Sequence, residues 1–267
     1  LCSSGDTDEA VGIPFVDLAD DPDEPAEIIP LLNSLPGAEA VVYIDFDGEV
    51  VTGTRWVSGG TINAEPAGFD EARIREVWEE VAEDMRPFKI NVTTDRAVYD
   101  AAQQNKKMMC IVTPTNDAAP GAGGVAFLNS FYDGSIDPCW AFNLSAGSCA
   151  MTISHEVGHT FGLNHDGLLG QAEQEEYHRG NGTWGPIMGA PFGLNVVSWS
   201  DGGYEGSTNP EDDLQIINDR SAEFRDDQFG DSDAEAFDIA GEPGDEDVEL
   251  EGIIETPDDV DVFTFRT

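Results

Sequence analysis

Apolar and polar positions in the first third of the chain predict a strand followed by a helix. The run AVVYIDFDG at 40–48 is apolar and β-branched and closes on Asp-Gly, as a buried strand does. Residues 69–88 repeat apolar side chains at helical spacing, and Pro87 marks the end of that helix.

Two further strands are predicted at 89–95 and 108–115, with a short helix at 95–105 between them. The resulting order of strand, helix, strand, helix, strand favours parallel pairing in a mixed α/β layer. Apolar runs at 123–131 and 138–144 follow with only a short gap. That gap is too short for a helical crossover, so we expect one of the pair to run antiparallel at an edge of the sheet.

The pattern becomes helical again from Cys149 to about Leu163, and then turns rich in glycine, proline and tryptophan. The ends of the chain differ from this middle part. Residues 1–38 are acidic and punctuated by prolines, which predicts an irregular arm, and 224–267 form an acidic linker that ends in a strand-like DVDVFTFRT. We therefore expect one core domain at 39–223 with an appendage at each end.

The charge of the chain is strongly negative. Its 267 residues carry 54 Asp and Glu against 12 Lys and Arg, a formal net charge of −42. Such a surface repels nucleic acid and anionic lipid, and no apolar run is long enough to span a membrane. A net charge this negative is typical of adaptation to a salty, marine or halophilic medium. The alternative is that some carboxylates form Ca²⁺ sites, although no complete EF-hand loop is present.

The four cysteines are Cys2, Cys110, Cys139 and Cys149, and no C-x-x-C pair suggests a thiolate metal site. We expect a Cys139–Cys149 disulfide, which fits a secreted, extracellular protein. Two readings of Cys2 stay open, a structural disulfide or a thiolate that caps a metal and keeps the protein latent.

Three of the four histidines lie in TISHEVGHTFGLNHDG at 152–167. His155 and His159 are four residues apart, so both fall on one face of a helix. Gly162 can end and reverse that helix, which lets His165 return with a third nitrogen. Three neutral imidazoles with one open position form a catalytic Zn²⁺ arrangement, and Glu156 is the candidate general base.

The stretch HEVGHTFGLNH matches H-E-x-x-H-x-x-G-x-x-H, and the chain thereby resembles the metzincin metallopeptidases. The resemblance implies a twisted, mostly parallel five-stranded sheet with an antiparallel edge strand. It also implies an active-site helix and an irregular C-terminal subdomain with a methionine turn, for which Met188 in WGPIMGAPF is the candidate. The domain would divide into an upper part at 39–162 and a lower part at 163–223.

Two details are similar to the reprolysin and adamalysin group, and the sparse cysteines suggest a bacterial member. Asp166 follows the third histidine and would support the site, and the position two after Met188 is Ala190, so the tyrosine ligand of astacins is absent. The stretch GGVAFLNSF resembles the edge strand that binds substrate in this group. Its candidate substrate-binding residues are Gly124, Val125, Ala126, Phe127, Leu128 and Asn129.

The resemblance implies a secreted zinc endopeptidase in which Glu156 draws a proton from zinc-activated water. Its partners would be protein or peptide substrates, and we expect a monomer. Two alternatives are a zinc-containing surface or matrix protein that binds without cutting, and a zinc hydrolase of non-peptide amides. The end of the chain, GIIETPDDVDVFTF, resembles the start of a bacterial pre-peptidase C-terminal β domain.

Overall fold

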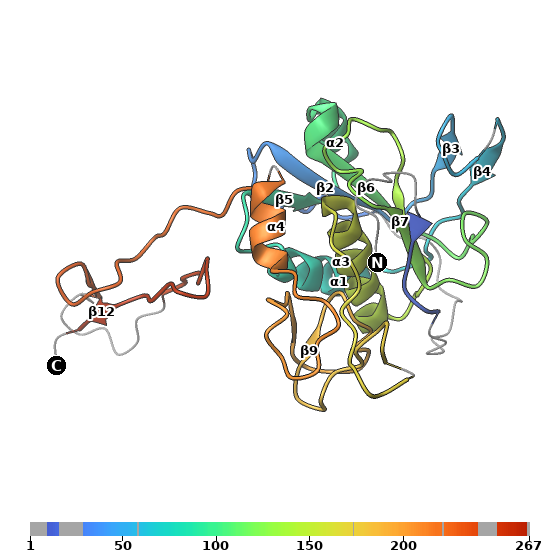
Figure 1. Cartoon of the computed structure of the whole chain (residues 1–267). Helices are drawn as coiled ribbons and strands as arrows, with labels where there is room; N and C mark the ends of the chain where they lie inside the picture. Colours follow the sequence, from blue (N-terminus) through green and yellow to red (C-terminus); the bar gives the residue numbers. More distant parts are fainter. Residues whose placement is uncertain are drawn as a thin grey trace.

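A six-stranded sheet forms the centre of the protein (Figure 1). The computed structural model describes residues 10–15, 29–57, 59–172, 174–220, 222–239 and 250–265. Across the sheet the strands run in the order β1-β7-β8-β6-β2-β5. In chain order they are β1 (Ala10–Val11), β2 (Ala40–Asp45), β5 (Ile90–Thr93), β6 (Lys107–Val112), β7 (Gly124–Phe127) and β8 (Cys139–Ala141).

The predicted α/β arrangement is confirmed in its main features. Strands β5, β2, β6 and β8 are parallel, and β7 pairs antiparallel with β8. The expected number of five strands is wrong, because β1 adds to the outer edge of β7 as a second antiparallel strand. The segment that forms β1 lies in the acidic N-terminal arm, for which the sequence predicted only irregular structure.

Both faces of the sheet are buried, which explains the continuous apolar runs in its strands. In β2, Val42 and Ile44 face the main core, whereas Tyr43 faces a second cluster with Ile111 and Trp140. Period-2 alternation thus distributes apolar side chains to two cores. The main core lies under the two long helices, α1 (Glu71–Asp84) and α3 (Ala146–Phe161).

Helix α1 forms where the apolar spacing predicted it. Asp70 caps its start by accepting a hydrogen bond from the Arg73 amide at 2.7 Å, and Ile74, Val77 and Val81 are buried. The short helix predicted between two strands is α2 (Arg96–Ala101), followed by a 3-10 turn at Gln104–Lys106.

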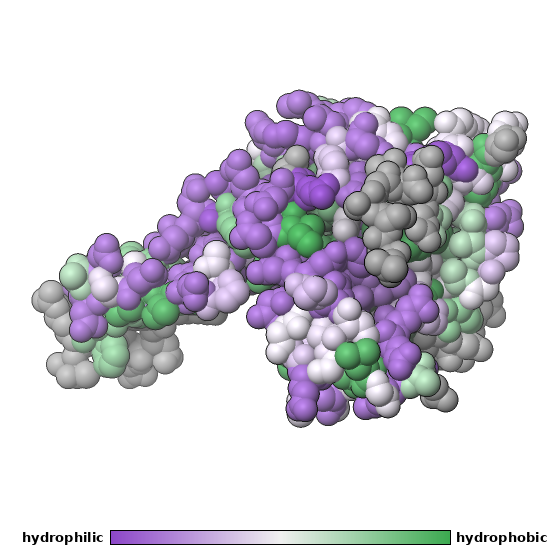
Figure 2. All heavy atoms as spheres, viewed as in Figure 1, coloured by the Kyte–Doolittle hydropathy of each residue, from purple (hydrophilic) through white to green (hydrophobic). Residues whose placement is uncertain are grey.

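Several short elements lacked a sequence signal. They are the hairpin β3 (Val50–Thr52) and β4 (Thr61–Asn63), the parallel pair β9 (Gly185–Pro186) and β10 (Val197–Ser198), and α4 (Asp213–Asp219). The predicted terminal strand is present as β12 (Phe263–Thr264), which pairs with β11 (Phe237–Asp238). Figure 1 shows this C-terminal part extending away from the sheet, and Figure 2 shows both hydrophilic and hydrophobic residues on its surface. Among the described residues, no helix is long and apolar enough to cross a bilayer.

The predicted Cys139–Cys149 disulfide is wrong. Cys110, Cys139 and Cys149 are buried free thiols. Cys139 lies in β8 opposite Cys110 of β6, and its Sγ donates to the carbonyl oxygen of Met109 at 3.6 Å, whereas Cys149 lies in α3. Cys2 lies outside the described residues, so both readings of it stay open.

Candidate active site

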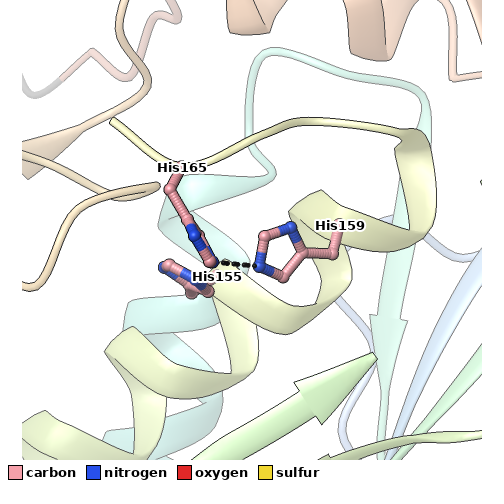
Figure 3. A group of neighbouring side chains, drawn as sticks. All are labelled: His155, His159 and His165. Atoms are coloured by element: carbon pink, nitrogen blue, oxygen red, sulfur yellow. Dashed lines mark hydrogen bonds between the residues drawn. The ribbon is translucent and has the colours of Figure 1, made fainter. Parts of the chain in front are cut away.

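Helix α3 carries two of the three clustered histidines. His155 and His159 are fully buried and one turn apart on this helix. The helix ends at Gly162, whose φ of 99° lies in the left-handed region, and the Gly162 amide donates to the carbonyl oxygen of His159 at 2.8 Å. The chain then turns back and brings His165 against the other two rings (Figure 3), as the motif predicted.

The three imidazoles converge on one point. Their ring centroids are 4.7 Å apart for His155 and His159, 5.3 Å for His155 and His165, and 4.7 Å for His159 and His165. Each ring offers one nitrogen, and these nitrogens all lie within 4.8 Å of one another. The Nε2 atoms of His159 and His165 are 3.0 Å apart.

Backbone carbonyls fix the tautomers of the two helical histidines. Nδ1 of His155 donates to the carbonyl oxygen of Ile187 at 2.8 Å, and Nδ1 of His159 donates to that of Leu163 at 2.8 Å. Because a carbonyl can only accept, both protons lie on Nδ1 and both Nε2 atoms present lone pairs. Nε2 of His155 is buried without a protein partner. This donor set fits a divalent cation such as Zn²⁺.

Burial keeps the three rings neutral. It lowers the pKa of His155 to about 3, with a further contribution from His165, and it lowers the pKa of His165 to about 4. The pKa of His159 falls well below its usual value for the same reason. Neutral imidazole is the form that binds a metal.

Glu156 lies beside the metal-binding histidines and is fully buried. Its Oε1 accepts a hydrogen bond from the amide of Ile13 at 3.2 Å, and Oε2 has no protein partner. Burial raises the pKa of the carboxyl well above its usual value. A Cβ at Gly124 would lie 2.6 Å from Oε1, so the glycine of β7 makes room for this carboxylate.

The segment around Met188 packs against α3 next to the histidine site. The Gly189 amide donates to the carbonyl oxygen of Pro186 at 3.0 Å, so Met188 sits in a tight turn and is fully buried. The Asp166 amide donates to the carbonyl oxygen of Met188 at 2.8 Å. The turn thus connects the chain after the third histidine to Ile187, which accepts the hydrogen bond from His155.

Four of the six predicted substrate-binding residues form β7, namely Gly124, Val125, Ala126 and Phe127. The other two lie beyond the strand. Asn129 has a positive φ of 64°, and its amide donates to the carbonyl oxygen of His159 at 3.1 Å, so the chain here packs against the end of α3. Leu128 and Asn129 are therefore not part of the edge strand that the sequence predicted.

Sequence reasoning missed Tyr177 and Ile13. The ring of Tyr177 lies 4.3 Å from that of His165, and its hydroxyl donates to the carbonyl oxygen of Gly12. Tyr177 belongs to an acidic, aperiodic loop and Ile13 to the N-terminal arm, so neither carried a local signal. His178, to which the sequence assigned no role, is buried and accepts a hydrogen bond from the Gly180 amide at 2.9 Å.

A second group of possible metal ligands lies in the C-terminal part. Ligand atoms of Asp227, Asp259 and Asp261 are within 4.8 Å of one another. Nearby, Glu255 is only 3% exposed and neither of its carboxylate oxygens has a hydrogen-bond partner. The Glu255 amide donates to Oδ2 of Asp259 at 2.9 Å. The acidic composition offered Ca²⁺ sites as an alternative, and these carboxylates are one candidate location among the described residues.

Comparison with known proteins identifies the class of the histidine site. Residues 76–166 match the family model described as metallo-peptidase family M12B, reprolysin-like. The match extends from α1 to Asp166 and includes all three histidines and Glu156. This segment is similar to a reprolysin-like metzincin domain, and the match supports a zinc-dependent metallopeptidase. No curated protein and no solved structure shows a match to the chain.

Proposed function

We propose that the protein is a secreted zinc endopeptidase that hydrolyses peptide bonds in proteins. The observation that carries the proposal is the convergence of three imidazole nitrogens beside the buried carboxylate of Glu156. His155, His159 and His165 would hold the metal. When bound, Zn²⁺ supplies a Lewis acid that lowers the pKa of water to about 7 and polarises a carbonyl.

Glu156 moves the proton in this scheme. Its Oε1 already accepts a hydrogen bond from a backbone amide. When a peptide bond breaks, the nitrogen of such an amide becomes the leaving amine. The carboxylate accepts a proton from the attacking water and passes it to that nitrogen. Gly162, Asp166 and Met188 are positioning residues, since they set the turn and the backbone contacts around the three rings.

An extended substrate would bind along β7 as an added antiparallel strand. A hydrophobic cluster beside this strand contains Met151 and Ala190, with Phe192 packed against them. Met151 and Phe192 also line a cavity of about 850 Å³ that extends along residues 191–199. The segment after Met188 would thus select side chains, and the protein would act as a monomer.

Two other functions compete with the peptidase. A zinc protein that only binds its target has no need for a carboxylate next to the metal ligands, and Glu156 therefore argues against it. A hydrolase of non-peptide amides would share the same residues. The strand-like edge of β7 favours a peptide, because main-chain groups of an extended chain match it.

Digestion of casein by the zinc-loaded wild type and by Glu156→Gln separates these functions. We expect wild type to degrade casein and the variant to be slower by roughly 10²–10⁴-fold, the usual contribution of a general base. Zinc content of the two proteins should be equal, since Glu156 is not a ligand. Equal rates for the two proteins, or no digestion by either, would refute the peptidase assignment.

A further inference from the structure

Residues 10–15 lie along the outer edge of β7 as an extended peptide. The β1 part of this segment pairs antiparallel with β7. The pairing continues past β1, because the Gly123 amide donates to the carbonyl oxygen of Ile13 at 2.8 Å and Pro14 bridges to Ala122. Addition of a strand to a free edge is the way a sheet binds an extended peptide. The segment therefore lies along the same edge of β7 at which an extended substrate is proposed to bind.

The peptide group between Gly12 and Ile13 lies between two functional side chains. Its nitrogen donates to Oε1 of Glu156 at 3.2 Å, and its carbonyl oxygen accepts from the hydroxyl of Tyr177. The ring of Tyr177 in turn lies 4.3 Å from that of His165. A proton carrier thus contacts the nitrogen of this bond, and a hydrogen-bond donor contacts its oxygen, beside the histidine cluster.

The side chains on either side of this bond also fit the site. Ile13 is 1% exposed and belongs to a hydrophobic cluster with Met151 and Ala190, against which Phe192 packs. Gly12 has no room for a side chain, since a Cβ there would overlap the carbonyl oxygen of Gly124. The cluster holds a branched aliphatic residue after the bond, and the strand requires glycine before it.

We propose that the Gly12–Ile13 bond is itself a substrate of this active site, and that the segment closes the cleft until the bond is cut. The inference rests on the proposed peptidase function. Hydrolysis adds the hydroxyl of water to the carbonyl carbon of Gly12, and Glu156 delivers the proton to the nitrogen of Ile13 as the C–N bond breaks. The products are a carboxylate at Gly12 and an amine at Ile13.

Tyr177 is a catalytic residue in this scheme, because its hydroxyl contacts a reacting atom. It donates a hydrogen bond to the Gly12 oxygen, which gains negative charge as water attacks. The same contacts define the substrate class of the enzyme. It would cut other extended peptides between glycine and a branched aliphatic residue.

Intact mass and N-terminal sequencing of the zinc-loaded chain test the cleavage. We expect wild type to yield a chain that begins at Ile13, and Glu156→Gln to stay intact. Gly12→Val should also stay intact, because the added side chain cannot fit against Gly124 and displaces the segment from the cleft. Its digestion of casein should continue, since the cleft is then open. A wild type that digests casein but keeps Gly12–Ile13 intact would overturn the inference alone. Loss of both activities would refute the peptidase itself.

Hydrogen exchange provides a readout that does not depend on catalysis. In Glu156→Gln, we expect slow exchange of the amides in residues 10–15, since the segment is bound and uncut. Adding Ile13→Asp should release the segment and speed this exchange at least tenfold, because a carboxylate would enter an apolar pocket. The matched control is Phe15→Asp, which changes a side chain that is 52% exposed and should leave exchange unaltered. Equally fast exchange in all three proteins would overturn the inference.

Replacement of Tyr177 by Phe tests its role. We expect kcat on a Gly-Ile peptide to fall roughly 10²-fold with KM nearly unchanged, as for loss of one donor to a developing oxyanion. Zinc content should stay equal to that of wild type. A KM effect without a kcat effect would show that Tyr177 only binds the segment, and the assignment as a catalytic residue would be wrong.

Discussion

The sulfur of Met188 lies directly against Gly158, the residue before His159 on α3. A Cβ at Gly158 would be 2.6 Å from this sulfur and 3.1 Å from the ring of Trp199. The helix and the turn beneath it can approach this closely only because residue 158 has no side chain. The contact sets the distance between α3 and Ile187, whose carbonyl orients His155.

Gly158→Ala should therefore weaken zinc binding. The new methyl group separates α3 from the turn and disturbs the hydrogen bond from Nδ1 of His155 to Ile187. Loss of such a supporting contact typically costs 10–100-fold in metal affinity, which a competition titration with a chelator measures. Gly147→Ala is the matched control, since a Cβ at that position of α3 meets nothing within 4 Å. Equal affinities in the two variants would contradict this account of the turn.

The histidine site could be predicted from sequence because its geometry is local. Helical spacing places His155 and His159 together, and one glycine explains the return of His165. The contact of Ile13 with Glu156 joins residues 143 positions apart, and no periodicity encodes it. The sixth strand was missed for the same reason, because β1 is two residues long and its position depends on β7.

The cysteine prediction failed because sequence separation is a poor guide to distance. Cys139 and Cys149 are ten positions apart, but one lies in a strand and the other in a helix. Strand pairing instead places Cys139 opposite Cys110, which is distant in sequence. The parallel strands were predicted correctly, since their apolar runs and the helix between them leave few other arrangements.

Ionisation of the Asp84 carboxyl should make the protein less stable as pH rises. Burial raises the pKa of this carboxyl to about 7, and Ser154 donates to it at 2.6 Å. The unfolded chain releases this proton near pH 4, whereas the folded chain retains it to about 7. Unfolding therefore releases a proton between these values, so stability falls over that window and levels off above it.

Comparison of Asp84→Asn with wild type isolates this effect. The variant should gain stability relative to wild type as pH rises from 4 to 8, by roughly 2 kcal/mol. The rise in the pKa of Asp84 corresponds to about 4 kcal/mol for a fully buried carboxyl. Solvent contact of the half-buried side chain reduces this free energy. Urea unfolding at several pH values measures the difference, with the exposed Glu79→Gln on the same helix as control. A constant difference across pH would contradict the assignment.

Calcium should order the C-terminal part of the chain. Four carboxylates gather there, those of Asp227, Glu255, Asp259 and Asp261, and oxygen ligands of this kind suit Ca²⁺. In the Glu156→Gln background, millimolar Ca²⁺ should slow hydrogen exchange of the amides in residues 250–265. The double variant Asp259→Asn, Asp261→Asn should lose the response, and the exposed Asp233→Asn should keep it. A response equal in all three proteins would argue against this site.

High salt should stabilise the protein. The net charge of −42 makes the folded chain repel itself, and the Debye length falls to about 3 Å at 1 M salt. We expect the melting temperature to rise by several degrees between 0.1 and 2 M NaCl, and equally in KCl. A flat or falling melting temperature would contradict the adaptation to salty media that the composition indicates.

X-ray absorption at the zinc edge, combined with metal analysis, tests the central claim most directly. We predict one Zn²⁺ per chain with three imidazole nitrogens at about 2.0 Å and a light atom in the remaining position. Replacement of any one of His155, His159 and His165 by Ala should lower the metal content. A protein that binds no zinc, or binds it through sulfur or through fewer than three imidazoles, would contradict the account.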